Sequence, residues 1–209
     1  MKRISMILLL CLLLPLCLTA CGREEPVTEE EILPIAKSLI ERSIVVNTAL
    51  IGDGAPRGDE AFGEYLYVDR AWEDLHSVRS VEDLLSLTAS VYTTQIYGIL
   101  YSEAITKDGQ EPPDYQNRAV TDTNPLGGLL IHKDREGWYK DTEHEYRYDT
   151  MKMTASTANT ATVTMKVVIT PEGYKPQERE LTLNLLRTAD GWRCDKLTYV
   201  AYDYSIVNE

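Results

Sequence analysis

Histidine, cysteine and carboxylate side chains are the groups in this sequence that could carry proton transfer, nucleophilic attack or metal binding. The three histidines, His76, His132 and His144, are far apart in the sequence, and only His144 has carboxylates directly beside it. Because neighbouring side chains on a strand point to opposite faces, Glu143 and Glu145 lie away from His144. We therefore expect no metal site, no cofactor and no catalytic group here.

Local catalytic motifs are also absent from the sequence. It contains no Gly-x-Ser-x-Gly elbow, no His-Glu-x-x-His helix, no Cys-x-x-Cys pair and no phosphate-binding glycine loop. If the chain were an enzyme, Asp149 or Glu143 would be the best candidate for a general base in a pocket. The sequence favours a protein that does not catalyse a reaction.

Cys21 is the residue whose chemical modification is indicated most clearly by the sequence around it. Two basic residues at the start precede an apolar run over 6–18, and Leu18-Thr19-Ala20-Cys21 follows. This run is shorter than the roughly 20 helical residues that cross a bilayer, and it is typical of a signal peptide. Its ending resembles the bacterial lipobox, in which the cysteine thiol accepts a diacylglyceryl group before cleavage. The alternative is ordinary secretory cleavage after Ala20.

This interpretation divides the chain into three parts. We expect a lipoprotein signal peptide over 1–20, a lipidated Cys21 with a short polar tether over 21–28, and a single domain over 29–209. Two acyl chains anchor a protein stably, so the membrane is an expected partner and the domain is expected on its extracytoplasmic face. The signal peptide removes two cysteines and lipid occupies a third, which leaves Cys194 as a buried thiol without a disulfide partner.

The charge of the chain excludes one class of partner. The formal net charge is −12, and it becomes −14 without the two basic residues of the signal peptide. Phosphate binding needs clustered Lys and Arg, so we expect no nucleic acid partner.

The aromatic residues suggest a surface or a pocket. The chain has 13 Tyr and 3 Trp but a single Phe, so nearly every ring carries a polar group. Such rings are common where one side packs and the other meets water or a ligand, although plain core and rim packing explains them as well. The candidate binding residues are Tyr97, Tyr101, Trp138, Tyr139, Tyr146 and Tyr148.

Helices are predicted in the first half of the chain. Thr28 and Glu31 have the spacing of a capping box before an apolar stripe with helical period. Pro34 conflicts with this start, so the helix either kinks there or begins at Pro34. Ser80 is expected to cap a second helix, and Thr93 or Thr94 a third.

Strands dominate from about residue 115. The segment 161–169 alternates strictly between apolar and polar residues, and a parity shift before it, between Tyr148 and Met151, predicts a bulge. The Asp190-Gly191 pair predicts a hairpin turn. The expected fold is therefore α+β, with N-terminal helices packed on a curved antiparallel β-meander.

The order of these elements and several short stretches resemble known families. The final hairpin, with Asp190-Gly191-Trp192, is similar to that of the nuclear transport factor 2-like fold, which is also called cystatin-like. Three stretches resemble the IseA-type inhibitors of cell-wall DL-endopeptidases in Gram-positive bacteria. They are Tyr65-Leu66-Tyr67-Val68-Asp69, residues 80–94 with the ending Val91-Tyr92-Thr93-Thr94, and Leu129-Leu130-Ile131-His132.

The narrower resemblance implies a noncatalytic function. Such a protein would bind a secreted cell-wall hydrolase and block its active-site cleft, and the candidate blocking loops are Gly127-Gly128, residues 134–137 and residues 171–176. The alternative is a lipoprotein that binds a small molecule in a pocket between helices and sheet.

Overall fold

The first helix, α2 (Glu29–Leu50), begins at the predicted capping box. In the computed structural model, which describes residues 25–51, 55–104, 120–121, 126–133 and 142–205, Thr28 Oγ1 accepts from the Glu31 amide at 3.3 Å. The Glu31 carboxylate in turn accepts from the Thr28 amide at 3.0 Å. Pro34 lies inside the helix and costs one backbone hydrogen bond, to Glu30, whereas the box supplies two at the terminus. The alternative start of this helix at Pro34 is therefore wrong.

Three further helices follow in the described part of the chain: α3 (Arg70–His76), α4 (Val81–Val91) and α5 (Thr94–Ala104). Ser80 caps α4 as predicted, because its hydroxyl accepts from the Asp83 amide at 3.0 Å. Thr93 lies immediately before α5, and its carbonyl accepts from the Tyr97 amide at 2.9 Å. Helix α3 was not predicted. It is held by Asp69 at its N-terminus and ends at a left-handed Ser77.

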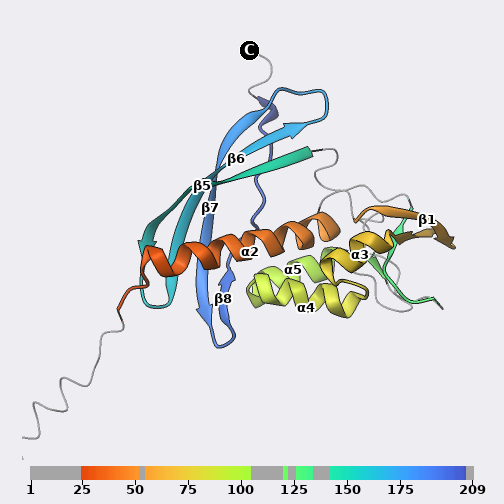
Figure 1. Cartoon of the computed structure of the whole chain (residues 1–209), viewed down its shortest axis with the longest axis horizontal. Coiled ribbons are helices and arrows are strands. Elements are labelled where there is room, and N and C mark those ends of the chain that lie inside the picture. The colour runs from red at the N-terminus through yellow and green to blue at the C-terminus, as the bar shows by residue number, and fades with distance from the viewer. Residues whose placement is uncertain (1–24, 52–54, 105–119, 122–125, 134–141, 206–209) are drawn as a thin grey trace, which may run out of the picture.

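The C-terminal half forms an antiparallel meander in the order β5-β6-β7-β8. Its strands are β5 (Thr142–Ser156), β6 (Thr160–Pro171), β7 (Gln177–Thr188) and β8 (Gly191–Cys194). The predicted bulge in β5 is confirmed by a shift of register between Arg147 and Lys152. Figure 1 shows α2 lying across one face of this sheet, so the α+β prediction with a helix on a meander is confirmed.

A second sheet stands apart from the meander. It has the order β1-β2-β4-β3 and consists of β1 (Arg57–Phe62), β2 (Tyr65–Val68), β3 (Val120–Thr121) and β4 (Leu130–His132). Strand β4 pairs with β2 and β3, not with β5, so the strands that follow residue 115 do not form one continuous meander as expected.

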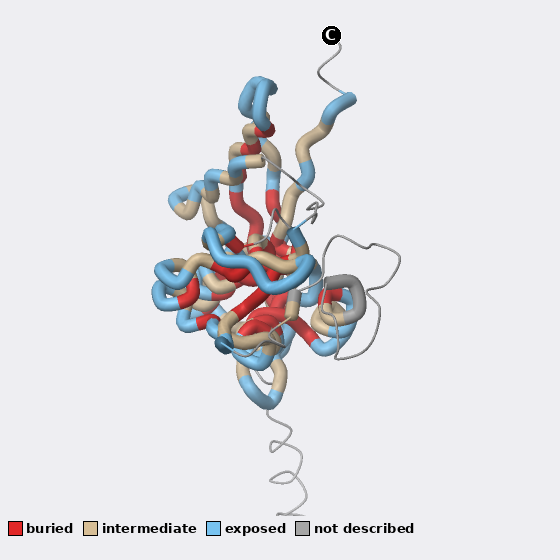
Figure 2. Tube along the Cα trace, turned by 90° about the vertical axis from the view of Figure 1, so that its right-hand side faces the viewer, coloured by how far each residue is buried: buried red, intermediate tan, exposed pale blue. Residues whose placement is uncertain are grey.

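The space between α2 and the meander is filled by the hydrophobic core. The apolar inward residues of β6 and β7 are at most 3% exposed, as are the apolar residues that α2 turns toward them. Figure 2 shows this buried zone running through the middle of the molecule, with exposed turns around it. The side chains that meet there are Ile32, Ala36, Leu39, Ile40, Val163, Met165, Val167, Ile169, Leu181, Leu183 and Leu185.

A polar network crosses this core and joins three distant segments. We define it as Ser43 and Asn47 of α2, Tyr92 after α4, and Thr198 after β8, all of which are buried. The Tyr92 hydroxyl donates to Asn47 Oδ1 at 2.7 Å and lies 2.9 Å from Thr198 Oγ1. Asn47 Nδ2 donates to Thr198 Oγ1 at 3.0 Å, and the Thr198 hydroxyl donates to Ser43 Oγ at 2.5 Å. Most buried polar groups in folded proteins find partners in this way.

The turn before β4 is held by a buried carboxylate. Glu73 of α3 is 1% exposed, accepts from the Leu129 amide at 2.7 Å and pairs with Arg70 at 2.8 Å. Arg70 also donates to the Gly127 carbonyl at 3.2 Å. Gly128 has φ +90°, and a Cβ there would lie 2.5 Å from Arg70 Nη1, so this turn requires glycine.

Candidate functional site

The structure places the predicted aromatic residues on different elements. Tyr97 and Tyr101 form a stacked pair on α5, with ring centroids 6.1 Å apart, and Tyr146 and Tyr148 form another on β5 at 6.5 Å. Burial raises the pKa of Tyr146, whose hydroxyl donates to the Thr198 carbonyl at 3.3 Å, so this ring belongs to the core. Trp138 and Tyr139 lie outside the described residues.

The candidate acid and base groups do not converge. Glu143, Glu145 and Asp149 are exposed on the outer face of β5, as the alternation predicts, while His144 faces inward. The His144 Nε2 atom lies 2.9 Å from the Val200 carbonyl, and its ring lies 4.3 Å from that of Tyr199. No group of three or more His, Cys, Asp or Glu in the described ranges could hold a metal ion.

Cys194 is buried, as predicted. Its side chain is 1% exposed, and burial raises the pKa of the thiol to about 12. Because the thiolate is the reactive form, this environment disfavours nucleophilic chemistry at Cys194.

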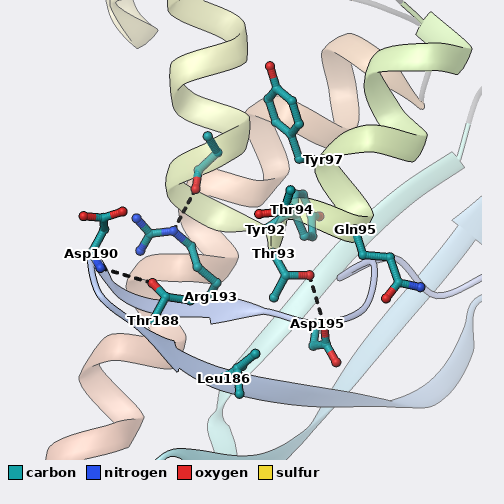
Figure 3. A pocket seen from close by; sticks show the side chains of 11 residues that line it. Tyr92, Thr93, Thr94, Gln95, Tyr97, Leu186, Thr188, Asp190, Arg193 and Asp195 are labelled. Carbon is teal, nitrogen blue, oxygen red and sulfur yellow. Dashed lines mark hydrogen bonds between the residues drawn. The ribbon is translucent and has the colours of Figure 1, made fainter.

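A groove of about 540 Å³ lies at the edge of the molecule, between the α4–α5 junction and the β7–β8 hairpin. We call it the hairpin groove. Of the predicted aromatic residues, it includes only Tyr97. Figure 3 shows Asp190 and Arg193 toward the hairpin turn, with Asp195 and Gln95 toward the other end. The lining residues are Ala89, Tyr92, Thr93, Thr94, Gln95, Tyr97, Leu186, Thr188, Asp190, Arg193 and Asp195.

Arg193 is held in place by backbone carbonyls. Its Nε donates to Ala89 in the last turn of α4 at 2.7 Å, and its Nη1 donates to Trp192 at 2.9 Å. Helix α4 has no basic residue in its own last turn, but Arg42 of α2 also donates to the Ser90 carbonyl at 3.3 Å. Two cations from other elements thus satisfy the negative end of α4. Burial and the nearby charge of Arg193 lower the pKa of Arg42.

The other end of the groove is formed where β8 meets the start of α5. The Thr93 amide donates to the Cys194 carbonyl at 3.0 Å, and the Thr93 hydroxyl donates to Asp195 Oδ1 at 3.0 Å. These bonds fix the Asp195 carboxylate beside the first turn of α5. The Asp190-Gly191 turn is predicted by its residues, but the groove is not, because nothing in the sequence shows that this hairpin folds against α5.

A second exposed feature lies at the far end of the meander. Tyr174, in the turn between β6 and β7, packs against Tyr202 and Tyr204, with ring centroids 5.8 and 5.2 Å away. Tyr174 is 45% exposed and Tyr204 is 53% exposed. We call these three residues the tyrosine tip. Figure 1 shows this end of the sheet projecting beyond the helices, with the C-terminal segment beside it.

The described helices do not combine the length and apolarity that crossing a membrane would need. Comparison of the sequence with family models and with curated proteins finds no match.

Proposed function

We propose that this chain is a membrane-anchored, extracytoplasmic lipoprotein that binds a secreted cell-wall hydrolase and inhibits or modulates it without catalysis. The anchor is the proposed diacylglyceryl group on Cys21. The finer fold assignment belongs to the same proposal: a nuclear transport factor 2-like domain of the IseA-type inhibitor kind. The observation that carries the proposal is the exposed, projecting tyrosine tip.

Among the three candidate blocking loops, the turn over 171–176 suits a cleft best. The Gly127 carbonyl accepts from Arg70 of α3, and a Cβ on Gly128 would collide with the Arg70 and Glu73 side chains, so this turn packs tightly on the fold. Residues 134–137 lie outside the described ranges. The turn at Tyr174 projects from the sheet and presents aromatic rings, and tyrosine is enriched among the residues that dominate protein–protein affinity.

The charge near the tip supports a basic partner. The outer face of β5 and β7 beside the turn carries four exposed carboxylates, Glu143, Glu145, Glu178 and Glu180. Two of them form ion pairs, Glu145 with Arg147 and Glu178 with Lys166, and Lys166 also lies across the sheet from Glu180. The net charge of −14 expected after removal of the signal peptide would also speed the encounter with a basic hydrolase at low salt.

The test is to titrate the full chain, purified in mild detergent, into a panel of peptidoglycan endopeptidases while the rate of stem-peptide cleavage is followed. We expect inhibition of at least one enzyme at micromolar concentration. Tyr174→Ala should weaken it about tenfold or more, as expected for a central aromatic contact. The matched control is Leu75→Ala, since Leu75 is 77% exposed on α3, away from the tip.

Two results would refute this proposal. One is the absence of binding and inhibition across the panel at micromolar concentration. The other is an inhibitory chain in which Tyr174→Ala and Leu75→Ala behave alike, since the tip would then take no part.

The second candidate function is the binding of a small molecule, and the hairpin groove favours it. Its volume of about 540 Å³ is within the range of ligand pockets. The sequence suggested a pocket at the interface between helices and sheet. Core side chains fill the interface between α2 and the meander, and the groove lies elsewhere, at the edge of the molecule.

A further inference from the structure

The hairpin groove carries opposite charges at separated positions along one cavity. Figure 3 shows the Arg193 guanidinium toward the hairpin turn and the Asp195 carboxylate at the opposite end, with Thr93 and Thr94 between them. Arg193 and Asp195 form no ion pair with each other among the described residues, so neither charge neutralises the other directly. This inference extends the second candidate function, ligand binding in the groove, and is independent of hydrolase inhibition.

The hydrogen bonds of these two side chains fix their orientation and leave part of each available. Within the described ranges, Arg193 uses Nε and Nη1 for backbone carbonyls, which leaves the Nη2 amino group for a ligand. Asp195 accepts the Thr93 hydroxyl on Oδ1, and its Oδ2 has no partner among the described residues. A guanidinium and a carboxylate that are already oriented lose little freedom when they bind.

The remaining lining supplies neutral contacts. The Tyr97 ring and Leu186, which is 37% exposed, provide apolar surface on opposite sides of the groove, and Gln95 adds an amide near Asp195. Asp190 lies at the hairpin turn, where its amide donates to the Thr188 hydroxyl at 3.3 Å. The described lining residues therefore place acid at both ends and include one cation, Arg193, so a ligand with only negative charge is disfavoured.

We infer that the hairpin groove binds a small zwitterion, an amino acid or short peptide with a free amino group and a free carboxylate. The ligand carboxylate faces Arg193 Nη2, and its ammonium group faces Asp195 Oδ2 and the Gln95 amide oxygen. Apolar side chains of the ligand rest on Tyr97 and Leu186. Charge-assisted hydrogen bonds of this kind are the strong ones in recognition.

Isothermal titration of the full chain in mild detergent with dialanine tests this inference. The companion probes are N-acetyl-dialanine, which lacks the ammonium group, and dialanine amide, which lacks the carboxylate. We expect dialanine to bind and each blocked form to bind about tenfold more weakly, which corresponds to the loss of one charge-assisted contact.

A variant then assigns the amino end of the ligand. Asp195→Asn removes the charge but keeps an oxygen that accepts from Thr93. It should weaken dialanine and dialanine amide about tenfold and leave N-acetyl-dialanine unchanged. Asp59→Asn, at an exposed position of β1, is the matched control and should change nothing.

The outcomes separate the inference from the function on which it rests. If blocked and free peptides bind equally well, or if Asp195→Asn binds dialanine as tightly as the parent chain, the zwitterion assignment is overturned while ligand binding stands. If none of the three probes binds at millimolar concentration, this ligand class is overturned. A thermal-shift screen of unrelated small molecules that finds no ligand would overturn ligand binding itself.

Discussion

Replacing Tyr92 by phenylalanine tests whether the polar network holds the helices and the C-terminal segment together. The substitution keeps the ring, which is 1% exposed, and removes only the hydroxyl. That hydroxyl donates to Asn47 Oδ1 at 2.7 Å and contacts Thr198 Oγ1 at 2.9 Å. After the change, the Thr198 hydroxyl still has Asn47 Nδ2 and Ser43 as partners, but Asn47 Oδ1 has lost its donor and the Thr198 amide has lost an acceptor at 3.4 Å.

The expected cost follows from that orphaned oxygen. Asn47 is 4% exposed, so water does not replace the lost donor freely. A buried polar atom without a partner costs about 1–3 kcal/mol, and we expect Tyr92→Phe to lower the free energy of unfolding by about 2 kcal/mol. In a chain of this size, that loss lowers Tm by about 4–8 °C.

Urea unfolding at pH 7, followed by circular dichroism, measures the effect. The control is Tyr204→Phe, because the Tyr204 ring is 53% exposed and its hydroxyl can exchange a protein partner for water. A double-mutant cycle with Asn47→Ala separates the orphaned oxygen from other causes. In the Asn47→Ala background, Tyr92→Phe should cost less than half of what it costs alone.

The reasoning fails if Tyr92→Phe and Tyr204→Phe unfold within about 0.5 kcal/mol of each other, the range of ordinary surface substitutions. It also fails if the cost of Tyr92→Phe is the same with and without Asn47.

Three further predictions concern other parts of the fold. Burial raises the pKa of the Cys194 thiol from 9.0 to about 12, so the unfolded chain loses this proton at a lower pH than the folded chain does. The free energy of unfolding should therefore fall by about 1 kcal/mol per pH unit between pH 9 and 12. The urea midpoint of Cys194→Ala should decline less steeply with pH over that range than the midpoint of the parent chain, and equal slopes would contradict this. Gly128→Ala should destabilise the chain by about 1–3 kcal/mol, because the φ of +90° strains any residue with a Cβ and the Arg70 guanidinium must also move away from it. Gly98→Ala, in open space within α5, should instead stabilise the chain by up to about 1 kcal/mol; equal thermal midpoints for the two variants would refute this difference. Thr28→Ala should cost about 1 kcal/mol by removing the capping box, and faster hydrogen exchange confined to the first turns of α2 would be its signature.

Local patterns predicted the elements whose neighbours are close in sequence. The alternation through Val163, Met165 and Val167 specifies a strand with one buried face, and the caps at Thr28 and Ser80 satisfy helix amides directly. These features depend on residues within a few positions of one another, so the local sequence is enough to predict them.

Features that depend on distant partners were not predictable in the same way. Strand β4 pairs with β2, more than 60 residues earlier, and nothing in Leu130–His132 indicates that partner. Helix α3 has seven residues, too few to show a helical period. The hairpin groove was missed for the same reason, since Arg193 reaches Ala89 across more than 100 residues of sequence.

The two ends of β6 have different neighbours. At the start of the strand, the Val27 amide donates to the Thr157 carbonyl at 3.1 Å, so the described chain begins beside the β5–β6 turn. The tyrosine tip follows the opposite end, after a strand of 12 residues that spans about 40 Å at 3.4 Å per residue. If Cys21 carries the proposed lipid, the sheet acts as a rigid spacer that carries the tip outward from the bilayer. Shortening the tether would then move the base of the domain but leave this fixed reach unchanged.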